Sequence, residues 1–187
     1  MSVAQGQLDA LYAGTDDPWD FRSSPYERAK FEATLAALPR PHYASALELG
    51  CGNGELGRRI ARRSDAYCGL DAVETALAAA REAVPDGRFV RDYLPCDLPD
   101  GAHDLIVLSE ILYFLDAGGI DATLAQIDGR WPGADVICVT WRGPSGNPLE
   151  GEAALALTLA ATERRAHLVR LDPQYRIDVL DPLPACR

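Results

Sequence analysis

The stretch Tyr43-Ala-Ser-Ala-Leu-Glu-Leu-Gly-Cys-Gly-Asn-Gly-Glu-Leu-Gly57 decides the fold. Its first half, up to Leu49, is an apolar run of the kind that forms a buried parallel strand. The glycines that follow predict a tight turn, and the arginine-rich segment 56–63 predicts a helix. A strand, a glycine turn and a helix N-terminus together present free main-chain N–H groups and the positive end of a helix dipole to a ligand.

Two ligand-binding patterns overlap in this turn. Glu48 followed by Gly50, Gly52 and Gly54 matches the E-x-G-x-G-x-G pattern of S-adenosylmethionine (SAM) methyltransferases. Gly52, Gly54 and Gly57 match the G-x-G-x-x-G pattern of dinucleotide-binding proteins. A glycine pattern is weak evidence by itself, so a purely structural turn in another α/β protein is a third interpretation. The rest of the chain must distinguish among the three.

Length and charge narrow the class of protein. The 187 residues suffice for one α/β domain, so we expect a single domain over residues 1–187. The net charge of −10 repels phosphate backbones, and nucleic acid is therefore not expected as a partner. The five cysteines, of which Cys186 is the last, are widely spaced and form no C-x-x-C pair, which predicts free thiols in a reducing compartment. No apolar run approaches about 18 residues and no signal-peptide pattern begins the chain, so we expect a cytoplasmic protein without a membrane span.

Strand and helix patterns alternate along the chain. Apolar runs predict strands at residues 44–49, 66–70, 88–90, 105–108, 135–140, 167–171 and 175–179. Helical patterns lie at residues 27–38, 55–63, 75–84, 120–127 and 152–162. This order predicts an α/β fold with a Rossmann-like, doubly wound sheet of seven strands, mostly parallel with an antiparallel last strand and flanked by helices. Residues 1–40 would form an N-terminal helical arm, and residues 43–187 the core.

Acidic side chains follow four of the predicted strands. Glu48, Asp71, Asp92 and Glu110 each lie at or just past a strand end. Because the carboxyl ends of parallel strands meet at one edge of a doubly wound sheet, where ligands bind, we expect these side chains to share one site. Asp71 suits ribose hydroxyls in either cofactor, whereas Asp92 suits the adenine amino group, as in SAM enzymes. The alternative for Asp92 is a turn cap.

A dehydrogenase interpretation fails on two features. The Tyr-x-x-x-Lys pair that short-chain dehydrogenases need occurs only as Tyr26 and Lys30, ahead of the first strand. A larger dehydrogenase needs a substrate domain, for which 187 residues leave no room. The sequence therefore favours SAM over a nicotinamide cofactor.

Three segments carry a resemblance to a known family. They are Asp17-Pro-Trp-Asp-Phe-Arg-Ser-Ser-Pro-Tyr-Glu-Arg-Ala-Lys30, the glycine loop within 46–54, and His103-Asp-Leu-Ile-Val-Leu-Ser-Glu-Ile-Leu-Tyr113. With them the chain resembles the nodulation protein S (NodS) family of N-methyltransferases, within the class I SAM-dependent methyltransferases. The resemblance implies SAM as cofactor, S-adenosylhomocysteine as product, and methylation of a glucosamine amino group in a chitooligosaccharide.

The chain departs from the pattern of that family at two places. Thr140 stands where a histidine usually precedes Trp141, and residues 151–155 lack a histidine usual near the start of the last helix. If those histidines line the acceptor pocket of the family, the acceptor of this protein differs.

The candidate site residues follow from the fold and the resemblance. An amine acceptor must arrive neutral, so we expect Glu110 to take up its proton or orient its lone pair, and Tyr113 to form a wall of the acceptor pocket. The alternatives are a turn cap for Glu110 and core packing for Tyr113. Trp19, Phe21 and Tyr26 are expected to cover the cofactor, or else to pack on the sheet as part of a helix. Arg28 or Arg22 is expected to pair with the carboxylate of the cofactor. The residues expected to bind the cofactor are Trp19, Tyr26, Arg28, Glu48, Gly50, Cys51, Gly52, Gly54, Asp71, Ala72, Asp92, Tyr93 and Ser109.

The sequence thus predicts a SAM-dependent methyltransferase whose partner is a small-molecule acceptor, most directly an amine such as an amino sugar. Two alternatives stay open: O- or carboxyl-methylation of a small metabolite, and a module that binds SAM or a nucleotide without chemistry. Carboxylates and histidines at metal-ligand spacing are not evident, so no metal is expected.

Overall fold

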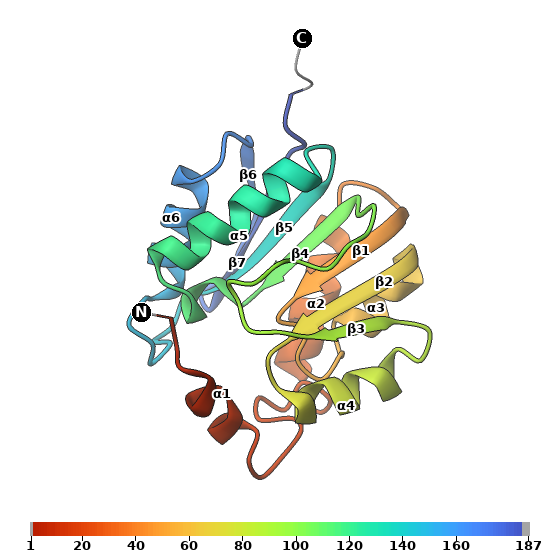
Figure 1. Cartoon of the computed structure of the whole chain (residues 1–187), viewed down its shortest axis with the longest axis vertical. Helices are drawn as coiled ribbons and strands as arrows, with labels where there is room; N and C mark the ends of the chain where they lie inside the picture. Colours follow the sequence, from red (N-terminus) through yellow and green to blue (C-terminus); the bar gives the residue numbers. More distant parts are fainter. Residues whose placement is uncertain (1, 185–187) are drawn as a thin grey trace.

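A seven-stranded sheet organises the protein in the computed structural model, which describes residues 2–184 (Figure 1). The strands are β1 (Tyr43–Leu49), β2 (Ser64–Asp71), β3 (Arg88–Arg91), β4 (Leu105–Ser109), β5 (Asp135–Trp141), β6 (Ala166–Leu171) and β7 (Tyr175–Leu180). The helices are α1 (Gln5–Leu11), α2 (Pro25–Ala37), α3 (Gly57–Ile60), α4 (Glu74–Ala83), α5 (Ala117–Arg130) and α6 (Gly151–Ala160), with short 3-10 turns at Ala61–Arg63 and Leu112–Phe114.

The strand order is β3-β2-β1-β4-β5-β7-β6. The strands β1 to β5 pair in parallel, and β7 pairs antiparallel with both β5 and β6. The expected doubly wound sheet and its antiparallel last strand are therefore confirmed. The chain winds outward from β1 to β3, then returns to the other side of β1 with β4, and this reversal is the switch point at which such sheets bind ligands.

Apolar side chains cover both faces of the sheet. One cluster joins the sheet to α5 and α6, and includes Ile106, Leu124 and Leu155. The other lies under α2 and α3, and includes Phe31 and Ile60. Figure 1 shows α5 and α6 on one face and α2 and α3 on the other. The fully apolar character of β4, whose residues 105–108 are buried on both sides, follows from this double cover.

The N-terminal arm contains one helix more than the sequence analysis predicts. Helix α2 begins as expected, because the Ser24 side chain accepts a hydrogen bond from the N–H of Glu27 and Pro25 occupies the first turn. Helix α1 was not predicted. No side chain caps its N-terminus and none of its residues is buried, so the usual signals of a helix, a cap and an apolar stripe, are missing.

The helix after the glycine loop is shorter than predicted. The segment 55–63 was expected to be one helix, but α3 spans only Gly57–Ile60 and continues as a 3-10 turn. The loop itself extends through Leu56 and takes up the first part of the expected helix. A four-residue helix has little dipole, so the expected attraction of a ligand to a helix N-terminus contributes little here.

The first residues lie across the sheet edge as a strap. The N–H of Val3 donates to the carbonyl of Phe114 at 2.9 Å, and the Tyr93 hydroxyl donates to the carbonyl of Val3. Cys51, Cys68, Cys96 and Cys138 are free thiols, and Cys186 lies outside the described residues. Within residues 2–184, no helix has the length and apolar character that crossing a membrane requires.

Candidate active site

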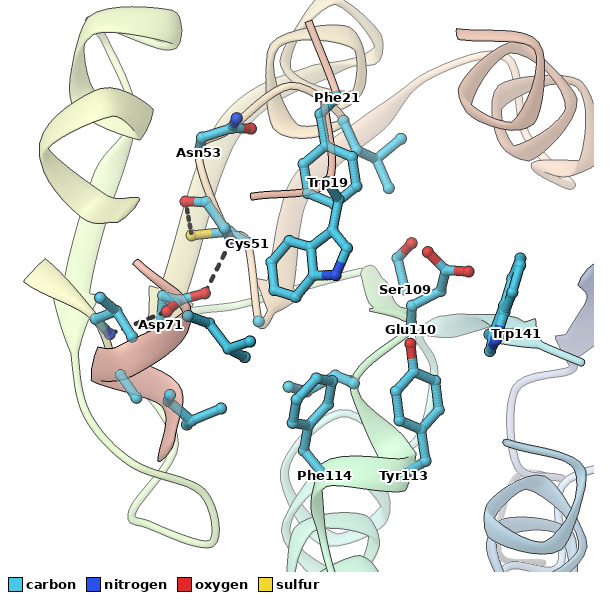
Figure 2. Close-up of a pocket in the computed structure, with 18 of the residues that line it drawn as sticks. Trp19, Phe21, Cys51, Asn53, Asp71, Ser109, Glu110, Tyr113, Phe114 and Trp141 are labelled. Carbon is cyan, nitrogen blue, oxygen red and sulfur yellow. Dashed lines mark hydrogen bonds between the residues drawn. The ribbon is translucent and has the colours of Figure 1, made fainter. Parts of the chain in front are cut away.

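A cavity of about 690 Å³ opens at the carboxyl ends of β1, β2 and β4. The glycine loop and Asp71 lie on one side of it, and Glu110, Tyr113 and Trp141 on the other (Figure 2). The N-terminal arm covers the cavity with side chains of α1, α2 and the segment between them. Its volume falls within the range of pockets that hold small-molecule ligands.

The glycine loop presents bare backbone to the cavity. The N–H groups of Gly50 and Cys51 both donate to the carbonyl of Leu70, at 2.8 and 3.0 Å, which fixes the turn after β1. Gly50 has a φ of +74°, and a Cβ there would lie 2.7 Å from the Cδ1 of Ile111. Gly52 has a φ of +52° and also lines the cavity. Only glycine suits such positions without strain, and a ligand can approach the main chain closely there.

Asp71, at the end of β2, ties the loop to the neighbouring strand. One of its carboxylate oxygens accepts from the N–H of Gly52 at 2.8 Å, and the other accepts from the N–H of Val73 at 3.0 Å. Burial raises the pKa of Asp71, and these two hydrogen bonds act against that rise. Asp92, after β3, is exposed at the cavity edge and accepts from the N–H of Tyr93.

Gly54 shapes the loop but does not line the cavity. It has a φ of +78°, and a Cβ there would lie 2.9 Å from the Cα of Ala80 in α4. The close approach of the loop to the helix therefore requires glycine. The prediction that Gly54 contacts the cofactor directly has no support in this position.

We expect Gly54→Ala to lower the melting temperature more than Gly146→Ala. Gly146 has a similar φ of +73°, but a Cβ there meets nothing within 4 Å. The left-handed backbone costs about 1–2 kcal/mol in both variants, whereas overpacking against Ala80 costs about 1–3 kcal/mol more in the first. At about 2–4 °C per kcal/mol, calorimetry should separate the two melting temperatures by several degrees. Equal losses would show that the loop and α4 can move apart.

Aromatic side chains of the arm form a continuous series over the cavity. Trp19 meets Tyr12 edge-on at 5.7 Å between ring centroids and stacks on Phe21 at 5.5 Å, and Phe21 contacts Phe31 of α2 at 5.8 Å. Trp19 is 41% exposed, whereas Tyr12 is buried against the glycine loop. The series joins α1 to α2 and limits the entry of water to the cavity.

A buried ion-pair network lies opposite the glycine loop. The ammonium of Lys30, in α2, is 2.8 Å from Oε2 and 3.0 Å from Oε1 of Glu27, and 2.5 Å from Oε2 of Glu110. Glu110 follows β4 with a φ of +55°, and its N–H donates to the carbonyl of Val139. Its second carboxylate oxygen, Oε1, is buried without a hydrogen-bond partner. In Figure 2 the Tyr113 hydroxyl points toward Glu110, and Trp141 stands beside it. Burial raises the pKa of Tyr113, and the charge of Glu110 acts in the same direction.

Glu48 also lines the cavity, but its partner is Tyr67 rather than Lys30. It is 2% exposed and accepts a hydrogen bond from the Tyr67 hydroxyl at 2.5 Å. Burial raises the pKa of Glu48 to about 8, and the Tyr67 bond opposes that rise. This hydrogen bond gives the Glu48 carboxyl a partner within the protein and links β1 to β2 beside the cavity.

Most of the expected site residues lie together, and two do not. Gly54 packs on α4, as described above. Arg28 is exposed on α2 and does not line the cavity, because the helical period that turns Glu27 and Lys30 inward turns Arg28 outward. The expected residues that line the cavity are Trp19, Tyr26, Glu48, Gly50, Cys51, Gly52, Asp71, Ala72, Asp92, Tyr93, Ser109, Glu110 and Tyr113.

Sequence reasoning missed several lining residues. Glu27 and Lys30 are three residues apart on α2, and their inward position was readable from the helical period once α2 was assigned. The side chains of α1 carried no such signal. Residues 144–147 after β5 also line the cavity, from a loop without regular structure. Among residues 2–184, no three His, Cys, Asp or Glu side chains converge as a metal site.

The chain matches the model of one protein family. The model described as Nodulation protein S (NodS) matches residues 6–127, which include most of the arm, the glycine loop and Glu110. The chain belongs to the NodS family. The expected kinship with class I SAM-dependent methyltransferases, and with NodS among them, is confirmed.

Individual relatives agree with the family assignment. The nodulation protein S of Azorhizobium caulinodans is 26% identical over 168 residues, which cover 81% of this chain and 79% of that protein. The trans-aconitate 2-methyltransferase of Acidovorax ebreus is 30% identical over 185 residues, covering 90% of this chain and 69% of the other. The crystal structure of the N-methyltransferase NodS from Bradyrhizobium japonicum with S-adenosylhomocysteine superposes with a TM-score of 0.76 at 18% identity, covering 94% of this chain and 97% of that one, which shows the shared fold.

Proposed function

We propose that this protein is a SAM-dependent N-methyltransferase that acts on a small-molecule amine. The charge of the cavity is the observation that supports the amine. Of the described residues that line it, six are acidic and one, Lys30, is basic. They are Glu27, Glu55, Asp71, Asp92, Glu110 and Glu48, of which Glu48 adds no charge at neutral pH because burial raises its pKa to about 8. An acidic cavity favours cationic ligands over anionic ones, which suits a sulfonium cofactor and an alkylammonium acceptor.

The glycine-loop side of the cavity suits the cofactor. The backbone at Gly50 and Gly52 is left open by the absence of a Cβ, and Asp71 and Asp92 offer carboxylate oxygens to hydroxyl or amino donors. Trp19 of the arm closes the same side against water. When bound, SAM supplies a methyl group activated by a positively charged sulfur.

The opposite side suits the acceptor. An alkylamine is protonated at neutral pH, with an ordinary pKa of about 10, and its nitrogen must lose that proton before it can act as a nucleophile. The Glu110 carboxylate takes the proton, and Tyr113 limits where the nitrogen can lie. Orientation of the two reactants alone can supply about 7–11 kcal/mol of barrier reduction, so positioning is the main task of this side.

Carboxyl methylation is the second candidate, because a trans-aconitate 2-methyltransferase is among the relatives. A polycarboxylate would enter a cavity in which Lys30 is the single cation of the described lining, and that cation is already paired with two carboxylates. Repulsion by the acidic lining therefore disfavours this candidate.

Turnover assays distinguish these functions. The purified protein should release S-adenosylhomocysteine from SAM with amine acceptors, among them glucosamine and short chitooligosaccharides, and the methylated nitrogen should be identified by mass spectrometry. Turnover of trans-aconitate with no turnover of any amine would establish the second candidate. Tight binding of SAM in calorimetry with no turnover of either class would point to a binding module. Because Thr140 stands where the NodS family usually has a histidine, we expect an amine other than the chitooligosaccharide.

A further inference from the structure

Lys30 is the only lysine in the chain, and it is buried. Its side chain is 2% exposed, with the ammonium 5.4 Å from the ring centroid of Tyr26. A buried ammonium is costly unless it is paired and hydrogen-bonded. Here it donates to Glu27 at 3.0 Å and to Oε2 of Glu110 at 2.5 Å. The second contact joins residues 80 positions apart and connects the arm to the end of β4.

Glu110 is held at both its main chain and its side chain. Its φ of +55° is rare for a residue other than glycine and costs about 1 kcal/mol or more. The N–H bond to Val139 fixes the main chain in this conformation, and Lys30 fixes Oε2. Oε1 is then buried without a partner, in a residue that lines the cavity. The arrangement holds the Glu110 carboxylate in one place at the cavity wall, as a proton acceptor requires.

Lys30 is also the cation that faces Glu110 among the described residues. The other titratable groups around it are Glu27 and Tyr26 on α2 and Tyr113 on the turn after β4. Burial raises the pKa of both tyrosines, so they are neutral at physiological pH. Beyond Tyr26 lie Asp172 and Tyr175 of the final hairpin. Without Lys30, Glu110 would face Glu27 with no compensating charge.

We propose that Lys30 is a positioning residue for methyl transfer, which fixes the carboxylate of Glu110 at the acceptor side of the cavity. This inference rests on the proposed amine N-methyltransferase activity. The inference gives the arm a second task besides covering the cofactor. The packing of α2 on the sheet brings Lys30 to Glu110 and so completes the acceptor site.

The single variant Lys30→Met tests the proposal incompletely, because it leaves the carboxylates of Glu27 and Glu110 near each other without the cation that pairs with both, and can fail to fold. The double variant Lys30→Met/Glu27→Gln avoids this, since it removes one positive and one negative charge together. We expect the double variant to bind S-adenosylhomocysteine within about threefold of the wild type in calorimetry, while its kcat for the amine falls at least tenfold. Lys30→Arg should recover part of the lost kcat, because it restores a cation.

Two outcomes would overturn the assignment. Wild-type kcat in the double variant would show that Lys30 only neutralises Glu27, and a loss of S-adenosylhomocysteine binding as large as the loss of kcat would show that Lys30 supports the structure as a whole rather than the position of Glu110. Failure of the proposed function is distinguishable from either, because it would appear as absent amine turnover in the unmodified protein, before any variant is compared.

Discussion

Glu110→Gln is expected to lower the turnover of an amine acceptor by about 10²- to 10⁴-fold, the usual contribution of a general base. Glutamine has the size of glutamate but cannot take up a proton. The variant leaves Lys30 paired with Glu27, so the buried charges still balance and the fold should persist. Because the glycine loop and Asp71 lie on the other side of the cavity, we expect the affinity for S-adenosylhomocysteine to stay within about threefold of the wild type. Steady-state kinetics and calorimetry together measure both quantities.

Glu32→Gln is the matched control for this variant. Glu32 lies on α2 as Glu27 does, but its side chain is 69% exposed and faces Arg59 away from the cavity. The same chemical change there should leave turnover unaltered. If Glu110→Gln retained full turnover while binding the cofactor normally, the proton of the acceptor would leave by another route, and Glu110 would be only a cap of the turn after β4.

The half of the cavity that we propose for the cofactor is readable from the sequence. An apolar strand, alternating glycines and an acidic residue at each following strand end are local signals, and the doubly wound topology brings them to one edge. Gly50, Gly52 and Asp71 therefore lie where the pattern predicts. The pattern could not separate Gly54 from the others, because its contact with Ala80 depends on how α4 packs.

The half that we propose for the acceptor depends on contacts that no local pattern encodes. The pairing of Lys30 with Glu110 spans 80 residues, and the unusual φ of Glu110 becomes visible only in the folded chain. The error over Arg28 has a simpler cause. Glu27, Arg28 and Lys30 are close in sequence, but successive residues of a helix differ in direction by about 100°, and only the packing of α2 on the sheet decides which of them turns inward.

Glu48→Gln is expected to remove a pH dependence of stability that the wild type shows between about pH 4.5 and 8. The ordinary pKa of this carboxyl is 4.5, and burial raises the pKa of Glu48 to about 8 in the folded protein. Between these values the folded state holds a proton that the unfolded state has released, so the free energy of unfolding falls as the pH rises. The full cost, reached above the folded pKa, is roughly 5 kcal/mol as an upper bound. Glutamine cannot ionise, yet it can still accept the hydrogen bond of Tyr67.

Melting temperatures of the cofactor-free proteins measure this effect, since bound ligand would itself shift the equilibrium. Near pH 4.5 the two proteins should melt at similar temperatures, and by pH 8 the variant should melt higher, by several degrees for each 2 kcal/mol recovered. Asp71, whose pKa burial also raises, is coupled to Glu48 through its charge, so its part of the slope is common to both proteins only apart from that coupling. Parallel curves of melting temperature against pH would mean that Glu48 is ionised in the folded protein. In that case its charge would need a partner beyond Tyr67, and the cationic sulfonium of the cofactor is the group that the proposed function would bring to this cavity.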